Sequence, residues 1–145
     1  MIFLKTDEEV ELMRASNILL GKTYAEIAKS IQPGVSTAQL DKIAYEFIMD
    51  HGGRPACLGY EGFPKSVCTS INEVVCHGIP KASDILEEGD IVNVDFTTIL
   101  DGYYADASRM FIIGKTTPEK EQLVRVAKEC LEIGMEVAKP FTFVG

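Results

Sequence analysis

Hydrophobic residues recur at helical spacing through the first third of the chain. Thr6 and Glu9 have the spacing of a capping box, and the apolar residues after them are three or four positions apart, or twice that. This pattern predicts a long amphipathic helix over residues 7–31, which Pro33-Gly34 ends. Its apolar positions are Val10, Met13, Leu20, Tyr24, Ile27 and Ile31.

A second helix is predicted between Ser36 and His51. Ser36 and Gln39 again form a capping-box sequence, and His51-Gly52-Gly53 ends the helix. We interpret His51 as a cation at the helix C-terminus rather than as a catalytic group. The apolar stripe of this helix is Leu40, Ile43, Ala44, Phe47 and Ile48.

The pattern changes between Arg54 and Pro80, where short segments alternate with glycine and proline. Residues 66–70 and 74–76 are strand-like, and the breaks around them suit the wall of a pocket. His77 follows the second of these segments. A histidine here can be structural, or it can act as a hydrogen-bond donor or acid/base group beside a carboxylate pair.

Residues 91–98 and 103–113 are rich in β-compatible residues and flank Asp101-Gly102, a strong turn signal. They predict a β-hairpin in which the numbers of paired residues sum to 203. This register puts Thr97 opposite Asp106 and Asp95 opposite Ser108. The two aspartates therefore lie on one face, the buried side, with Cβ atoms roughly 7 Å apart.

Two carboxylates this close repel each other by roughly 3 kcal/mol at about 6 Å and an effective dielectric near 20. A divalent cation between them would remove that repulsion. The alternative is that Asp95 and Asp106 are solvent-facing residues of an edge hairpin, although aspartate is depleted in strands. The pattern by itself indicates a metal site or an acid/base site.

A third helix is predicted to start at Thr117, the N-cap, with Pro118 at its first position, and to end at Lys139-Pro140. Residues 141–145 are apolar and end abruptly, which suggests a chain cut in mid-structure. The apolar stripe of this helix is expected to be core: Val124, Ala127, Leu131, Met135 and Ala138.

Composition narrows the class of protein. The 145 residues are 46% hydrophobic and 25% charged, which predicts one globular domain over residues 1–145. The net charge of -8 and the scattered basic residues argue against direct binding of nucleic acid. No segment resembles a signal peptide or a membrane span, so we expect a soluble, cytoplasmic protein with reduced cysteines.

Two stretches carry a family resemblance: PACLGYEGFPKSVCTSINEVVCHGIP at 55–80 and EEGDIVNVDFTTILDGYYADASRMFIIG at 87–114. They closely resemble the type I, bacterial methionine aminopeptidases. The resemblance continues through KTDEEVELMRAS at 5–16 and PGVSTAQLD at 33–41. It implies an α+β, pita-bread (creatinase/aminopeptidase-like) fold, an antiparallel β-sheet with flanking helices, of which only the N-terminal half is present.

The resemblance also implies an activity. Such enzymes remove the initiator methionine from nascent polypeptides, which they meet at the ribosome. The reaction uses water activated by two divalent metal ions, which could be Co, Mn, Fe or Zn. Asp95 and Asp106 match the first two metal ligands of the family, with Asp106 bridging both ions.

His77 matches the first active-site histidine, which is expected to contact the scissile amide and to steady the tetrahedral intermediate. Four further residues match positions that line the pocket for the methionine side chain, where sulfur and aromatic groups suit a thioether. They are Cys57, Tyr60, Phe63 and Cys68. Phe63 stands where some relatives carry tyrosine, which keeps the wall apolar.

The remaining family ligands, one His and two Glu, and a second active-site His come from a C-terminal half that this sequence lacks. We therefore expect weak metal binding and little or no peptidase activity from this chain alone, and self-association through uncovered apolar surface. Two other functions stay open. One is a non-catalytic pita-bread module that binds a protein, and the other is a hydrolase of the same fold that cleaves before proline or acts on creatine.

Overall fold

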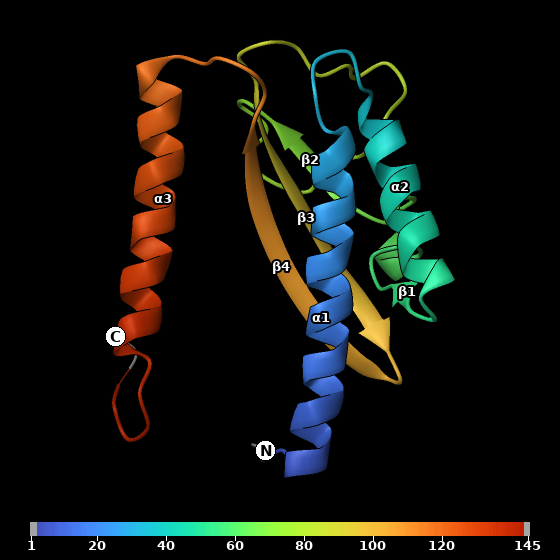
Figure 1. The fold of residues 1–145 in the computed structure, drawn as a ribbon, viewed down its shortest axis with the longest axis vertical. Helices are drawn as coiled ribbons and strands as arrows, with labels where there is room; N and C mark the ends of the chain where they lie inside the picture. The colour runs from blue at the N-terminus through green and yellow to red at the C-terminus, as the bar shows by residue number, and fades with distance from the viewer. Residues whose placement is uncertain (1–2, 144–145) are drawn as a thin grey trace.

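The computed structural model describes residues 3–143 and has the α+β architecture that the sequence predicts. Two helices come first, then short strands and loops, then a long hairpin and a last helix (Figure 1). The helices and strands in chain order are α1 (Asp7–Ser30), α2 (Thr37–Asp50), β1 (Arg54–Pro55), the 3-10 turn η1 (Tyr60–Gly62), β2 (Cys68–Ile71), β3 (Ile91–Leu100), β4 (Tyr103–Ile112) and α3 (Pro118–Val137).

Capping fixes the starts of α1 and α2, as predicted. The Thr6 hydroxyl accepts from the Glu9 amide while the Glu9 carboxylate accepts from the Thr6 amide, and Ser36 and Gln39 repeat the arrangement. At the other end of α2, His51 is the C-cap and its Nδ1 lies 2.8 Å from the Phe47 carbonyl oxygen. The predicted ends of both helices are thus confirmed.

The sheet is antiparallel and is built around β3. Strand β4 pairs along all of β3, while β2 and the two-residue β1 pair with different parts of β3. Asp101 and Gly102 both have positive φ, as a tight hairpin turn requires. The pairs Thr97–Asp106 and Asp95–Ser108 confirm the predicted register.

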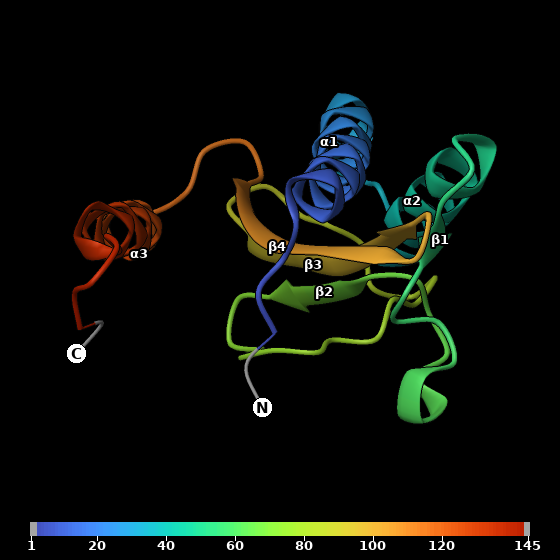
Figure 2. The same ribbon diagram turned by 90° about the horizontal axis from the view of Figure 1, so that it is seen from below.

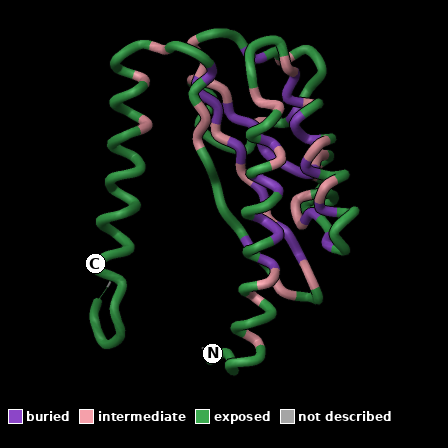
Figure 3. Tube along the Cα trace, in the orientation of Figure 1, coloured by how far each residue is buried: buried purple, intermediate pink, exposed green. Residues whose placement is uncertain are grey.

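The core lies between the sheet and one layer of helices. Figure 2 shows α1 and α2 on the same side of the β3–β4 hairpin. The side chains of alternate β3 residues, Val92, Val94 and Phe96, are fully buried in the core cluster. The buried positions of Figure 3 follow this layer. The opposite face of the hairpin, which carries Asn93, Asp95 and Thr97, stays partly exposed.

Helix α3 stands apart from the rest of the chain (Figures 1 and 2). Its start agrees with the sequence, since Thr117 is the N-cap and Pro118 begins the helix. The prediction that its apolar stripe is core was wrong for this chain: no residue of α3 is buried. None of the helices formed by residues 3–143 has the length and apolar character that a membrane span requires.

The strand predicted at residues 74–76 was also wrong. Residues 68–71 form β2, but a turn at Asn72, which has positive φ, ends the strand. Val75 is then 94% exposed. The β-branched pair that suggested a strand has no partner strand within the described part of the chain, and the segment is a loop.

Candidate metal and substrate site

The hairpin brings Asp95 and Asp106 together on the face turned away from α1 and α2. Asp95 lies on β3 and is half-buried, while Asp106 lies on β4 and is exposed. The expectation that both would lie on the buried side was therefore wrong for Asp106. The physical reason is that strand alternation points the apolar residues of β3 toward the helices, and no described element covers the other face at Asp106.

One hydrogen bond orients the exposed carboxylate. The hydroxyl of Thr97 donates to Oδ1 of Asp106 at 2.7 Å across the strand pair. In the described residues, no Lys, Arg or His nitrogen lies within ion-pair distance of Asp95 or Asp106. No direct ion pair among the described residues therefore neutralises the negative charge of this pair.

The charges around this pair affect the titration of Asp95. Burial raises the pKa of Asp95 above its ordinary value, the charge of Asp106 raises it further, and His77 partly offsets both effects. A divalent cation would instead lower the pKa of Asp95, because it favours the ionised carboxylates.

A cavity of about 460 Å³ collects the other predicted site residues. Its size is within the range of small-ligand sites, and its surface is mostly apolar. All five residues that the resemblance assigns to substrate contacts line it: Cys57, Tyr60, Phe63, Cys68 and His77. Asp95 lies nearby, since Cys68 pairs with it across β2 and β3.

A close backbone contact between Gly78 and strand β2 holds His77 at this cavity. The carbonyl of Gly78 accepts a hydrogen bond from the Thr69 amide at 2.8 Å, and the Gly78 amide donates to the Ser70 hydroxyl at 3.3 Å. A Cβ atom on Gly78 would lie 2.0 Å from the Thr69 carbonyl oxygen, so only glycine allows this approach. His77 itself has φ of 54°, an uncommon conformation for a residue with a side chain.

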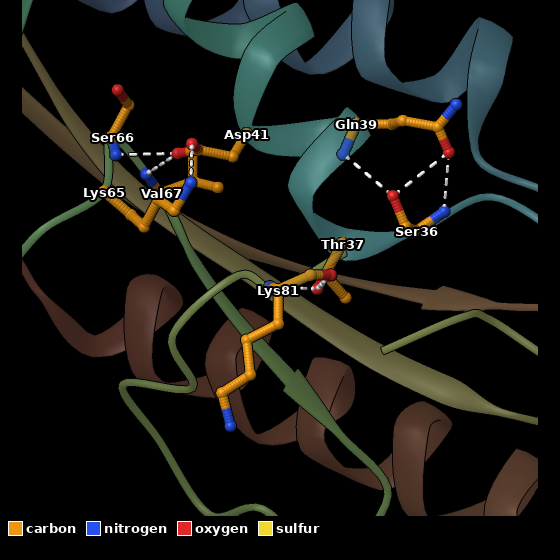
Figure 4. Close-up of polar contacts among 8 residues, drawn as sticks. All are labelled: Ser36, Thr37, Gln39, Asp41, Lys65, Ser66, Val67 and Lys81. Carbon is orange, nitrogen blue, oxygen red and sulfur yellow. Dashed lines mark hydrogen bonds and ion pairs between the residues drawn. The ribbon is translucent and has the colours of Figure 1, made fainter. Parts of the chain in front are cut away.

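Helix α2 anchors two segments that adjoin lining residues of the cavity in the sequence, and Figure 4 shows the polar contacts that hold them. The buried Asp41 accepts from the amides of Ser66 and Val67 at 2.7 and 3.2 Å, and Lys65 Nζ lies 3.4 Å from its other oxygen. This fixes the segment that leads from Phe63 to Cys68.

The segment after His77 is held from the same helix. The Thr37 hydroxyl donates to the Lys81 carbonyl at 3.0 Å and accepts from the Lys81 amide at 2.9 Å. Figure 4 shows this contact next to the Ser36–Gln39 cap, at the start of α2. One helix therefore positions two walls that are distant in sequence.

The two cysteines of the cavity interact with each other. A hydrogen bond from the Cys68 thiol lowers the pKa of Cys57 to about 6, and the same contact together with burial raises the pKa of Cys68. All four cysteines are free, as expected of reduced thiols. The wall of the cavity thus contains a polarisable sulfur pair.

Sequence reasoning missed part of the lining. The cavity also contacts Glu61, Gly62, Pro64 and Ile79. These residues belong to the 55–80 stretch that carries the family resemblance, beside Tyr60, Phe63 and His77, so their neighbourhood was the available signal. Nothing in the local pattern distinguishes a lining residue from a loop residue that points to solvent.

As ligands for a divalent metal, Asp95 and Asp106 fit in kind: they are oxygen donors, close together and without a counter-charge. In number they fall short. Within residues 3–143, no group of three or more His, Cys, Asp or Glu side chains is arranged to hold a metal ion. The pair would therefore supply only part of a metal site.

One known protein family matches almost the whole chain. The model of metallopeptidase family M24 matches residues 11–144. The chain belongs to metallopeptidase family M24. M24 membership confirms the resemblance on which the site assignment was based and implies dependence on metal ions.

The relatives within M24 include methionine aminopeptidases. Methionine aminopeptidase A of Synechocystis sp. is 46% identical over 144 residues, which are 99% of this chain and 57% of that protein. The crystal structure of methionine aminopeptidase from Rickettsia prowazekii superposes with a TM-score of 0.90 at 43% identity, over 92% of this chain and 54% of that one. The chain thus spans about half the length of these relatives, and it contains about half of their pita-bread fold.

A prolidase from Pyrococcus furiosus has a TM-score of 0.82 over 94% of this chain and 39% of its own. At 18% identity this likeness concerns the fold alone.

Proposed function

We propose that this chain carries the substrate pocket and the first two metal ligands of a methionine aminopeptidase. The complete enzyme would remove the N-terminal, initiator methionine from nascent polypeptides in the cytoplasm. The observation that carries the proposal is the convergence of Cys57, Tyr60, Phe63, Cys68 and His77 on one cavity next to Asp95. The likeness to methionine aminopeptidases, much closer than that to the prolidase, supports this substrate.

The pocket is suited to a methionine side chain. Phe63 and Tyr60 offer aromatic surface and Cys57 and Cys68 offer polarisable sulfur, which together favour an unbranched thioether over a charged side chain. The exposed position of His77 at the cavity lets its ring meet the scissile amide of a peptide whose first side chain fills the pocket. In this arrangement His77 donates a hydrogen bond and does not bind metal.

Asp95 and Asp106 would hold divalent ions, two of them in the complete enzyme, with Co, Mn, Fe and Zn all compatible with carboxylate ligands. When bound, such ions lower the pKa of water and polarise the carbonyl group of the scissile bond. Thr97 orients the carboxylate of Asp106, and Asp95 is the more buried of the two proposed ligands. This chain alone contributes only these two carboxylates.

The test separates binding from turnover. We expect the 145-residue chain to bind the peptide Met-Ala-Ser weakly, in preference to Lys-Ala-Ser, by saturation-transfer NMR on the alanine methyl group that both peptides share. Phe63→Ala should abolish that preference, whereas Tyr45→Phe, which alters a residue of α2 that does not line the cavity, should leave it unchanged. Equal binding of both peptides would refute the pocket assignment.

Turnover is tested with the same peptide and added Mn²⁺. Because two carboxylates do not hold a dinuclear centre tightly, we expect little or no release of methionine. Release at a robust rate, lost in Asp95→Asn, would contradict the partial site and show that the chain is a sufficient enzyme.

A further inference from the structure

Tyr24 lies directly behind the two aspartates, on the opposite face of the hairpin. It comes from α1, where helical spacing alone suggests an ordinary core residue. Its ring packs on Phe96 with centroids 4.5 Å apart, and only 5% of the residue is exposed. Its hydroxyl, however, is a polar group within this apolar core, and it contacts the backbone of both β3 and β4.

The hydroxyl contacts one carbonyl group in each strand. Its oxygen lies 3.0 Å from the carbonyl oxygen of Val94 on β3 and 2.6 Å from that of Ala107 on β4. Val94 immediately precedes Asp95, and Ala107 immediately follows Asp106. The phenol is therefore tied to both strands one residue away from each carboxylate.

The backbone amide of Phe96, the residue after Asp95, faces the phenol oxygen and acts to lower the pKa of Tyr24. The register pairs Phe96 with Ala107, so the hydroxyl lies between the two strands at this pair. A phenol placed there influences the spacing and twist of the strands where the aspartates project.

The phenol keeps its proton. Burial raises the pKa of Tyr24 far above its ordinary value, and the charges of Asp95 and Asp106 raise it further. The hydroxyl is therefore always able to donate to Ala107. A phenylalanine could fill the same space and would leave these contacts unmade.

We propose that Tyr24 is a positioning residue, whose hydroxyl fixes the backbone of β3 and β4 so that Asp95 and Asp106 stand at the separation that binds a divalent cation. This inference rests on the proposed metal site. It assigns to a helix residue, on the far side of the sheet, control over the geometry of two ligands that it does not touch. Groups that hydrogen-bond directly to metal ligands typically contribute about tenfold or more in metal affinity, and we expect an effect of about this size from Tyr24 through the backbone.

The experiment compares Tyr24→Phe with Tyr45→Phe in the 145-residue chain. Tyr45 lies on α2 and is 39% exposed, so its variant removes a hydroxyl away from the hairpin. Mn²⁺ affinity and the spectrum of the bound ion are measured by electron paramagnetic resonance. Tyr24→Phe is expected to raise the Mn²⁺ Kd by about tenfold and to change the spectrum, while Tyr45→Phe does neither.

Hydrogen exchange without metal gives an independent measurement. Tyr24→Phe should speed the exchange of amides around Asp95 and Asp106 more than that of amides near Ile91 and Ile112, at the far end of the hairpin. Replacing Tyr24 by 4-aminophenylalanine, which restores a donor at the same position, should recover both the local protection and the Mn²⁺ affinity.

Different failures have different meanings. If wild-type chain binds Mn²⁺ through a site that Asp95→Asn removes, and Tyr24→Phe binds it equally with the same spectrum, the role of Tyr24 is refuted and the metal site stands. An equal increase in exchange throughout the sheet would likewise refute positioning, because it would indicate only lower global stability. If Asp95→Asn binds Mn²⁺ as well as the wild-type chain does, or if neither binds it, the metal site itself is wrong and this inference falls with it.

Discussion

The hydroxyl of Thr97 on β3 donates a 2.7 Å hydrogen bond to Oδ1 of Asp106 on β4. Because both residues belong to the exposed face of the hairpin, this bond adds little to stability and acts mainly on the orientation of the carboxylate. Thr97→Val should therefore weaken Mn²⁺ binding several-fold. The free energy of unfolding should change by less than about 0.5 kcal/mol, since valine suits a strand equally well.

The measurements are an Mn²⁺ titration and urea unfolding of the same samples. Thr97→Ser, which keeps the hydroxyl, is the matched control and should bind like the wild type. Mn²⁺ binding by the valine variant as tight as that of the wild type would contradict the role of the hydrogen bond.

The raised pKa of Asp95 predicts that the free energy of unfolding depends on pH. Its pKa is raised in the folded chain by burial and by Asp106, so the unfolded chain ionises first as the pH rises. The folded state therefore loses stability from about the ordinary value of 3.8 up to the raised pKa, and loses no more above it. Asp95→Asn lacks this loss and should be the more stable protein at neutral pH.

Urea unfolding of wild type and Asp95→Asn across this window, without metal, checks the sign. The advantage of the variant should shrink as the pH falls toward 3.8 and vanish below it. Added Mn²⁺ should also reduce it, by stabilising only the wild type. An advantage that is constant at every pH would contradict the repulsion argument.

The hairpin shows which features a sequence determines locally. Asp101-Gly102 can adopt positive φ at both turn positions, and this alone sets the pairing of every residue from 91 to 112. The turn residues are therefore sufficient to predict that Thr97 lies opposite Asp106. They do not predict the exposure of Asp106, because exposure depends on what covers the hairpin and not on the strands themselves.

Asp41 provides a prediction about the cavity wall. It is only 8% exposed and accepts from two amides, of Ser66 and Val67, that are themselves buried. Asp41→Ala leaves both amides without this acceptor and should lower the free energy of unfolding by roughly 3 kcal/mol. Chemical denaturation followed by circular dichroism measures the loss.

The control for Asp41 separates the amides from the ion pair. Lys65→Met removes the cation 3.4 Å from Asp41 and keeps both amide bonds. Because the lysine is about one-third exposed, this variant should cost less than about 1 kcal/mol. Losses of similar size in the two variants would mean that the charge pair, not the amide capture, anchors the wall.

Tyr24 and α3 mark the limit of pattern reasoning. A tyrosine in an apolar stripe indicates a buried ring, which is correct, but the stripe says nothing of carbonyl groups 70 and 83 positions along the chain. The stripe of α3 has the same periodicity as that of α1, yet none of its residues is buried. Periodicity shows that a helix has a face to cover and does not show what covers it.

The uncovered face of α3 predicts self-association. Large apolar residues on this helix, among them Leu131, Ile133 and Met135, are about 60% exposed. Burying such side chains against a second copy would be favourable by about 25 cal/mol per Å² of apolar surface. We expect light scattering to give a mass that rises with concentration, and the double variant Leu131→Gln, Met135→Gln to shift this rise to higher concentration. Glu132→Gln, an exposed polar change on the same helix, is the control, and a wild-type mass that stays monomeric at high concentration would refute the prediction.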